Sequence, residues 1–393
     1  MTWATRTLVE LGDVSRGRSR HRPRNDPSLY GGDIPFVQTG DVKAAVLHLS
    51  TFKQTYNEAG LAQSRLWNSG TVCLTIAANI AETAILAIPA CFPDSVVGIT
   101  VDESEADRYF VKYLVDFMRQ RMTSVARGAT QDNLSLGKLL EFEFLCPPLE
   151  VQRRIAGVLR SLDEFIEAAH EECDTLHQWL DHFFEVTFPE EGAGERLDTI
   201  VDFVRGVEPG RAAYLASGSE STSPFARVAD LATTDLPDTF VPTERLGDAV
   251  ADPADILVSF DGTPGRVRIG HEGGFSSGIR RLDAASEVVT WGFLYCLMRS
   301  REIQAVISAH STGTTILHAS SAIPELRLPA SASPAAIKQF ERPASRLLHR
   351  YLARIDQIRA AAAMREVLLP KLVSGDIDVS DLVIGSPTED AAA

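Results

Sequence analysis

The longest regular pattern of apolar and polar positions runs from Pro148 to Phe188 and predicts a single long helix. Apolar residues recur there at alternating steps of four and three, a heptad pattern typical of coiled coils. These positions are Ile155, Leu159, Leu162, Ile166, Ala169, Cys173, Leu176, Leu180 and Phe183. An apolar stripe this narrow needs a partner helix to cover it.

The C-terminal part of the chain offers that partner, because its apolar residues follow the same rhythm. They are Leu348, Tyr351, Ile355, Ile358, Ala362 and Leu369. Pro343 interrupts the segment early, so we expect the regular helix to begin near this residue. Acidic residues occupy other positions of the first long helix, and we expect them to be solvated: Asp163, Glu164, Glu167, Glu171, Glu172 and Asp174.

Short apolar runs bounded by turn residues precede the first long helix and predict strands. They lie at 34–38, 71–76, 84–88, 96–101 and 142–146. An amphipathic helix is expected between Arg108 and Arg121, with Phe110, Leu114, Phe117 and Met118 on one face. Strands mixed with helices in this way indicate a compact α+β domain.

The same order of segments appears a second time, which predicts an internal repeat. Residues 11–17 (LGDVSRG) are echoed by residues 200–206 (IVDFVRG), at an offset of 189 positions. Residues 70–76 correspond to 254–260, and each copy ends in a long helix. Antiparallel pairing of the two helices would relate the copies by a pseudo-twofold axis and hold them apart. A helix of roughly 36 residues spans about 54 Å, close to the length of about 16 base pairs of duplex DNA.

The predicted organisation is therefore α+β, with two tandem globular domains separated by two long antiparallel coiled-coil helices. The expected boundaries are 1–148 for the first domain, 149–188 for the central helix, 189–333 for the second domain, 334–376 for the C-terminal helix and 377–393 for a flexible tail.

The net charge of −15 argues at first against a nucleic-acid partner. Residues 1–148 nevertheless carry 15 basic against 16 acidic side chains, whereas residues 188–330 carry 12 against 20, so local basic surfaces remain possible. The five cysteines form no CxxC pair and are expected to be reduced core residues of a cytoplasmic protein. No apolar run approaches 18 residues, so neither membrane insertion nor secretion is expected.

Three segments carry a resemblance to a known family. They are 74–99, which includes Leu-Thr-Ile-Ala-Ala-Asn; 147–156, Pro-Pro-Leu-Glu-Val-Gln-Arg-Arg-Ile-Ala; and 368–377, Leu-Leu-Pro-Lys-Leu-Val-Ser-Gly-Asp-Ile. In this order they resemble the DNA-specificity (S) subunits of type I restriction–modification enzymes. The resemblance implies two target-recognition domains that read the halves of a bipartite site in double-stranded DNA. It also implies two methyltransferase (modification) subunits docked on the paired helices, with restriction subunits joining for cleavage. S-adenosylmethionine is expected on the methyltransferase partners, and no cofactor on this chain.

Candidate DNA contacts are side chains that can bind phosphate or base edges. Arginine suits phosphate and guanine, and asparagine and glutamine suit adenine. In the first domain they are the arginine comb (Arg16, Arg18, Arg20, Arg22 and Arg24) with Gln38, Lys43, Asn79, Arg127, Thr130, Gln131 and Asn133. In the second they are Arg205, Arg211, Arg266, Arg268, Arg280, Arg281, Thr312, Thr314 and Thr315. The alternative for each is an ordinary exposed polar residue, and for the comb a mobile solvated loop.

No motif predicts catalysis by this chain. The Asn/Asp-Pro-Pro-aromatic turn of adenine methyltransferases is absent, and Asp261-Gly-Thr-Pro-Gly lacks the Lys-Ser/Thr of a phosphate-binding loop. His170, His177 and His182 are spaced poorly for one metal ion. Two alternatives to the specificity subunit stay open: a non-catalytic recognition scaffold in another phage-defence or methyltransferase assembly, and an enzyme with an unrecognised site between the globules.

Overall fold

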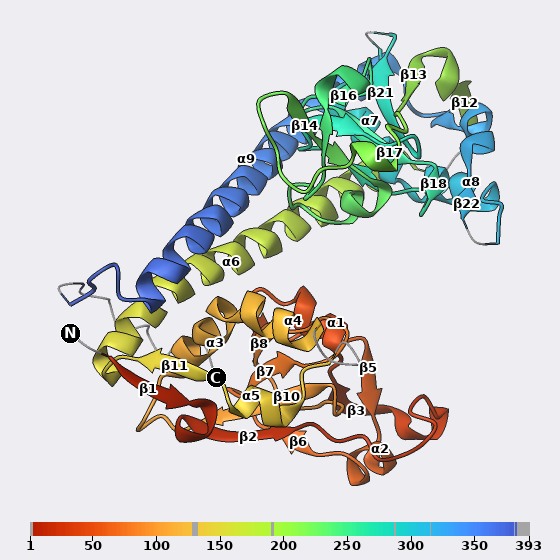
Figure 1. Ribbon diagram of the computed structural model, residues 1–393. Coiled ribbons are helices and arrows are strands. Elements are labelled where there is room, and N and C mark those ends of the chain that lie inside the picture. The colour runs from red at the N-terminus through yellow and green to blue at the C-terminus, as the bar shows by residue number, and fades with distance from the viewer. Residues whose placement is uncertain are drawn as a thin grey trace. The chain divides into compact units, whose positions relative to one another are not determined.

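The structure is a computed structural model that describes residues 3–127, 133–189, 192–286, 288–314, 316–380 and 382 (Figure 1). The chain divides into two compact units. The first unit comprises Met1–Ala168 and Ala360–Ala393, and the second comprises Ala169–Arg359. Two long helices, α6 (Leu149–Thr187) and α9 (Pro334–Val373), contribute residues to both units. The two long helices predicted from the heptad pattern are therefore present.

The predicted apolar stripe of α6 is buried along most of its length, from Ile155 to Leu180. Near the C-terminal end Phe184 takes the buried position, while Phe183 is half-buried and stacks on Phe340 of α9 with 4.7 Å between ring centroids. Within the second unit the helices run antiparallel, because Phe183 pairs with Phe340 whereas Glu172, earlier on α6, binds Arg354, later on α9.

Helix α9 begins nine residues before Pro343, so the prediction that the regular helix starts near this proline was wrong. Ser333 precedes the helix, and its hydroxyl accepts a hydrogen bond from the Ala336 N–H. Ile337 and Phe340 are buried in the early turns. Their packing offsets the backbone hydrogen bond that Pro343 cannot donate.

Asp163 was expected to be solvated and is instead completely buried, which corrects that prediction. Its carboxylate accepts hydrogen bonds from the Tyr113 hydroxyl at 2.8 Å, the Lys112 ammonium at 3.3 Å and the Arg365 guanidinium at 2.7 Å. Asp116 lies 2.9 Å from the same ammonium. Four charged side chains and one hydroxyl thus connect α3, α6 and α9 inside the first unit, and we call this set the Asp163 cluster.

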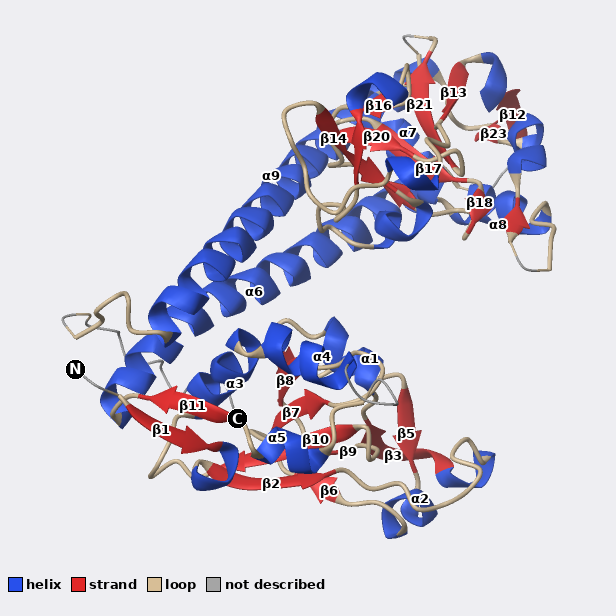
Figure 2. Cartoon of the chain, in the orientation of Figure 1, coloured by secondary structure: helices blue, strands red, loops and turns tan. Residues whose placement is uncertain are grey.

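The first unit contains two mixed sheets and one antiparallel pair of strands (Figure 2). The five-stranded sheet has the order β2 (Gly12–Arg16), β10 (Val96–Val101), β7 (Val72–Thr75), β8 (Thr83–Leu86) and β4 (His48–Leu49). The four-stranded sheet has the order β5 (Gln54–Tyr56), β3 (Tyr30–Phe36), β9 (Ala90–Cys91) and β6 (Leu66–Trp67), and β1 (Ala4–Thr7) pairs with β11 (Glu143–Cys146). The shorter helices are α1 (Thr39–Ala44), α2 (Glu58–Ala62), α3 (Arg108–Phe117), α4 (Arg119–Arg127) and α5 (Leu136–Leu140).

The second unit repeats this plan. One sheet has the order β13 (Val201–Arg205), β21 (Ile279–Ala284), β17 (Ile256–Ser259) and β19 (Val267–Arg268). Another has the order β15 (Phe240–Pro242), β14 (Thr222–Ala226), β20 (Gly273–Phe275) and β16 (Val250–Ala251). The remaining pairs are β12 (Ala193–Arg196) with β23 (Arg327–Pro329) and β18 (Asp261–Gly262) with β22 (Leu317–His318), and the shorter helices are α7 (Trp291–Arg299) and α8 (Arg301–Ala309).

The two units correspond strand by strand, including the direction of pairing. The parallel pair β3–β9 has its counterpart in the parallel pair β14–β20, and the neighbouring strands of both pairs are antiparallel. Strand β4 of the first unit and the pair β18–β22 of the second are additions to this shared plan. The internal repeat expected from the sequence is therefore present in the topology.

Candidate nucleic-acid interface

Each unit places an arginine followed by a glycine at the end of an edge strand, β2 in the first unit and β13 in the second. Arg16 and Arg205 are exposed at the ends of β2 and β13, and Gly17 and Gly206 follow them. A Cβ on Gly17 would overlap the carbonyl oxygens of Phe92 and Pro93, and a Cβ on Gly206 would overlap those of Phe275 and Ser276. Because the backbone passes so close to its neighbour, only glycine fits, and the exposed arginine is held at a fixed place.

The loop after the central strand of each unit is held by one hydroxyl group. In the first unit the Thr75 hydroxyl donates to the Asn79 carbonyl and accepts from the Glu82 N–H at 3.0 Å. In the second unit the Ser259 hydroxyl donates to the Thr263 carbonyl at 2.6 Å and accepts from the Arg266 N–H at 3.0 Å. We call the segments 75–82 and 259–266 the hydroxyl-held loops.

The hydroxyl-held loops also share their backbone conformation. Residues three and six positions after the hydroxyl have positive φ in both loops: 61° and 63° at Ala78 and Ala81, and 75° and 91° at Gly262 and Gly265. Alanine in this left-handed region costs roughly 1–2 kcal/mol. Backbone strain of this kind is concentrated at binding and active sites, which makes the 75–82 loop a candidate for contact with a ligand.

A second polar loop lies beside each hydroxyl-held loop. In the first unit the Leu134 N–H donates to the Ile76 carbonyl at 2.9 Å, and Asn133 forms a bridge with Ala77. In the second unit the Ala319 N–H donates to the Phe260 carbonyl at 2.7 Å. The segments that follow α4 and α8 are therefore brought next to the hydroxyl-held loops in the same way in both units.

The arginine comb is anchored by hydrogen bonds to the rest of the first unit. The Nη2 of Arg24 donates to both carboxylate oxygens of Asp94, at 2.8 and 2.9 Å, and the Arg18 guanidinium donates to the Ser64 carbonyl at 3.0 Å. Arg22 donates to the Ser19 and His21 carbonyls, both at 2.7 Å. Within the described part of the chain, the side chains of Arg16 and Arg20 are exposed and form no ion pair or hydrogen bond. These two guanidinium groups are thus the comb members that remain available to a ligand.

The other candidates of the first unit fall into two groups. Asn79 and Asn133 lie on the neighbouring loops just described, and Arg127 is exposed at the end of α4. Gln38 and Lys43 lie at the two ends of α1, where the side-chain amide of Gln38 donates to Oε1 of the Gln54 side chain at 2.5 Å. Thr130 and Gln131, and Thr315 in the second unit, lie outside the described residues.

Arg268 does not fit the prediction of a DNA contact. It is 4% exposed, and its guanidinium donates to the carbonyls of Asp230 and Asp235, the latter at 2.7 Å. Burial lowers the pKa of this guanidinium. An arginine enclosed by backbone carbonyls closes a loop against the sheet, and sequence alone does not separate this role from a surface contact.

The remaining candidates of the second unit differ in exposure and in whether their side chains already have partners. Arg211 is exposed, as are Thr312 and Thr314 on the loop after α8. Arg266 is half-buried and donates to the Val228 carbonyl at 2.9 Å, and Arg281 forms a bidentate ion pair with Asp283, both contacts at 2.8 Å. Arg205 and Arg280 line one surface pocket.

Sequence reasoning missed one pair in that pocket. The Nδ1 of His318 lies 2.8 Å from Oδ1 of Asp261. Fifty-seven positions separate the two residues, and no spacing rule connects them. The signal that could have found them is the repeat itself, because His318 lies in the segment that corresponds to the loop around Asn133.

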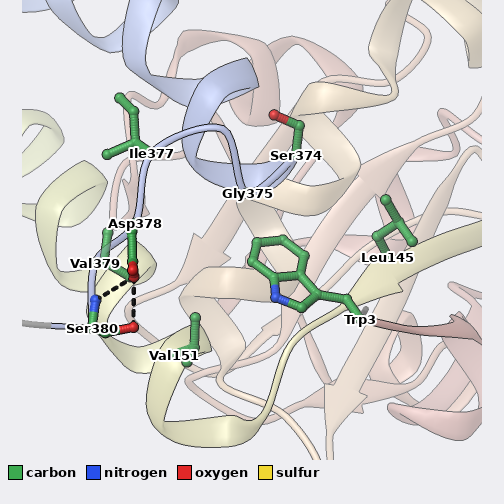
Figure 3. A pocket seen from close by; sticks show the side chains of 9 residues that line it. All are labelled: Trp3, Leu145, Val151, Ser374, Gly375, Ile377, Asp378, Val379 and Ser380. Atoms are coloured by element: carbon green, nitrogen blue, oxygen red, sulfur yellow. Dashed lines mark hydrogen bonds between the residues drawn. The ribbon is translucent and has the colours of Figure 1, made fainter. Parts of the chain in front are cut away.

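A different pocket, of about 440 Å³, lies in the first unit between Trp3 and the segment after α9 (Figure 3). The indole of Trp3 packs over Gly375. Asp378 is the one acidic side chain that lines it, and both the N–H and the hydroxyl of Ser380 donate to its Oδ1.

No group of three or more His, Cys, Asp or Glu residues within the described ranges is placed to hold a metal ion. In the same ranges, no helix has both the length and the apolar character needed to cross a membrane. All five cysteines are buried and unpaired, in agreement with their expected place in the core.

The fold and the site define a protein built from two repeated α+β units, each with a cluster of polar loops. Residues 1–178 match the family model described as the type I restriction modification DNA specificity domain. This match confirms the resemblance of the N-terminal part of the chain to type I specificity subunits.

Two relatives come from Methanocaldococcus jannaschii. The type I restriction enzyme MjaIX specificity subunit is 23% identical over 180 residues, which cover 45% of this chain and 41% of that protein. The putative type I restriction enzyme MjaX specificity subunit is 22% identical over 176 residues, which cover 44% of this chain and 40% of that protein. The match thus spans about two fifths of the length of each relative.

The crystal structure of the type I restriction–modification S subunit from M. genitalium resembles the whole chain. The TM-score is 0.56 at 15% identity, with 94% of this chain and 96% of that chain covered. At this identity the likeness establishes the fold alone.

Proposed function

We propose that the chain is the DNA sequence-specificity subunit of a type I restriction–modification complex. Each unit acts as a target-recognition domain and reads one half of a bipartite site in double-stranded DNA. The observation that carries this proposal is the repeated loop cluster, in which the same backbone and hydroxyl hydrogen bonds hold equivalent loops beside an exposed arginine in both units. The specificity domain matched by residues 1–178 supports it independently.

The polar loops supply contacts of two kinds. Arg16 and Arg205 have guanidinium groups that can bind phosphate or a guanine edge, and Asn79 and Asn133 have amides that can bind adenine. Phosphate contacts are expected to outnumber base contacts. The net charge of −15 opposes strong binding by the chain alone. Partner subunits are therefore expected to supply further contacts with DNA.

The partners in this proposal are two methyltransferase subunits docked on α6 and α9, with restriction subunits joining for cleavage. The chain would not be an enzyme itself, and S-adenosylmethionine would be bound by the methyltransferase subunits. Such a complex would act in the cytoplasm. The competing proposal, a non-catalytic scaffold in another phage-defence or methyltransferase assembly, predicts stable partner binding without sequence-specific methylation.

Co-expression with type I methyltransferase subunits, followed by mapping of methylated adenines, tests the proposal. The expected result is a bipartite motif with a fixed spacer. Asn79→Ala should relax or alter one half of the motif, and Thr263→Ala, the equivalent position in the second unit, should affect only the other half. Ser104→Ala, a surface change away from both loop clusters, should leave the motif intact. A stable complex that methylates nothing would overturn the proposal in favour of the scaffold.

A further inference from the structure

The second unit contains a surface pocket of about 510 Å³ in which positive charge gathers. Its polar lining comes from Arg205, Asp261, Ser277, Arg280, His318 and Ser320. The strands β13, β18, β21 and β22 supply four of these six residues. The pocket therefore lies within the loop cluster of the second unit.

Two guanidinium groups lie side by side in this pocket. Arg205 on β13 is paired in register with Arg280 on β21, and directly opposed residues of antiparallel strands project from the same face. Like charges in such a pair destabilise a sheet. Burial lowers the pKa of Arg280, and the charge of Arg205 lowers it further. A bound anion would relieve this repulsion.

No carboxylate in the described part of the chain neutralises the two arginines by an ion pair. Arg280 is 6% exposed and donates to the carbonyls of Ser277 and Ile279, at 2.8 and 3.1 Å, and to the Ser320 hydroxyl at 3.0 Å. Arg205 donates to the Ser277 carbonyl at 3.3 Å. All these acceptors are neutral. The Asp261 carboxylate lines the same pocket and raises the pKa of Arg280 without an ion pair to it, so it offsets only part of the positive charge of the two arginines.

The carboxylates nearest to the pocket have other partners. Asp261 binds His318, with 2.8 Å between Oδ1 and Nδ1, and thereby fixes the orientation of the ring. Glu208 accepts a hydrogen bond from the Tyr214 hydroxyl at 3.0 Å and reaches the Ser277 hydroxyl at 3.5 Å. Together these pairs leave the guanidinium groups as the charged donors of the pocket.

The described residues of the first unit differ at the equivalent place, although the topology is the same. Arg16 corresponds to Arg205, but the residue opposite Arg16 on β10 is Val97. Asn133, next to Ala77, takes the place of the His318–Asp261 pair. The fold can therefore form without a buried arginine at this position, and the desolvation of Arg280 needs an explanation other than folding.

We propose that this pocket binds one phosphate group of the DNA backbone and anchors the second unit on the duplex. The inference rests on the proposed function and adds a ligand to the unit whose overall charge is acidic. Arg205 and Arg280 bind the phosphate oxygens, and the hydroxyl of Ser277 or Ser320 donates a further hydrogen bond. A phosphate contact fixes position without reading sequence.

Arg205→Gln is the deciding variant, because Arg205 is exposed and its loss should leave the fold intact. Arg280→Lys, which keeps the charge but loses the forked geometry, is the second variant. The matched control is Arg301→Gln, since Arg301 has a 77% exposed side chain in the same unit and does not line the pocket. All are made in the full chain.

The first measurement is binding to short duplexes over a range of salt concentrations. Arg205→Gln should weaken binding about tenfold at low salt, equally for all sequences. The slope of log K against log salt should fall by about 1. Arg301→Gln should change neither quantity by as much.

The second measurement is thermal stability of the full chain in inorganic phosphate and in chloride at equal ionic strength. Phosphate should raise the melting temperature of the wild type more than that of Arg205→Gln. If the wild type binds duplexes but Arg205→Gln changes neither binding nor the response to phosphate, the pocket proposal is overturned and the proposed function stands. A response to phosphate without any binding to duplexes would overturn the DNA assignment of the pocket and count against the proposed function.

Discussion

The Asp163 cluster offers a sharp test of how α6 and α9 hold the first unit together. Asp163→Asn keeps the shape of the side chain but removes its charge. The substitution would remove the carboxylate that Arg365 shares with Lys112, which is 2% exposed. The new amide would also present N–H groups to these cationic donors. Removing one member of a buried ion pair costs about 3–5 kcal/mol, because the remaining charge stays buried.

The geometry places the expected loss toward the lower end of that range. Lys112 keeps Asp116 at 2.9 Å as a second partner. The Arg365 side chain is 29% exposed and can recover part of its hydration. The Tyr113 hydroxyl can still donate to the carbonyl oxygen of the asparagine. We therefore expect Asp163→Asn to lower the free energy of unfolding of the first unit by about 3 kcal/mol.

Hydrogen exchange in increasing urea, read by mass spectrometry, measures this loss because it reports each unit separately. Peptides from α3 should lose protection, whereas peptides from α7 in the second unit serve as the internal reference. The control is Glu164→Gln at the adjacent position, whose half-buried i,i+4 pair with Arg160 should contribute only about 0.3–0.5 kcal/mol. If both variants lower the stability equally, or if Asp163→Asn costs less than about 1 kcal/mol, the reasoning about buried charge is refuted.

Three further changes have defined outcomes. Ala78→Gly should stabilise the first unit by about 0.5–1 kcal/mol in urea unfolding, because glycine removes the left-handed strain at this exposed position; a loss of stability would contradict the assigned strain. Gly206→Ala should destabilise the second unit by more than about 2 kcal/mol, since its Cβ would overlap backbone carbonyls. Gly210→Ala, where the Cβ meets open space but φ is 86°, should cost only the roughly 1–2 kcal/mol of left-handed strain. Burial acts to raise the pKa of Glu167, but hydrogen bonds from His48 and from the Leu47 N–H hold it below its usual 4.5. Glu167 therefore stabilises the fold above about pH 4.5. The wild type should lose this contribution to its free energy of unfolding on acidification, whereas Glu167→Gln, which lacks the carboxylate, should show no such loss.

The elements that sequence predicted well are those with a strong local signal. The heptad pattern located both long helices, and the repeated segments 11–17 and 200–206 predicted equivalent strands because alternation and turn residues are local properties. The boundary of the C-terminal helix predicted at residue 334 agrees with the start of α9. The expectation that its regular part begins only near Pro343 was wrong, since the burial of Phe340 against α6 outweighs the local effect of the proline. Asp163 was misjudged for a related reason. Its partners lie on α3 and α9, and no local pattern reveals them.

The candidate site was predictable only in part. Arginines with alternating spacing marked the comb, but spacing does not tell that Arg24 is paired with Asp94 while Arg16 is not. Arg268 and Arg205 look alike in sequence, although one is enclosed by carbonyls and the other lines a pocket. The hydroxyl-held loops depend on the hydrogen bonds that the hydroxyls of Thr75 and Ser259 donate and accept, and these two residue types are too common to serve as a signal.

The division of the chain into units has a consequence for the order of events during synthesis on the ribosome. The second unit is a continuous segment, whereas the first needs residues from both ends of the chain. Its core includes Leu372 and Val373, and Asp163 depends on Arg365. At about 5–20 residues per second, Asp163 waits roughly 10–40 s for this partner. The unit that emerges first is therefore completed last, and the nascent chain is most exposed to misfolding and proteolysis in that interval.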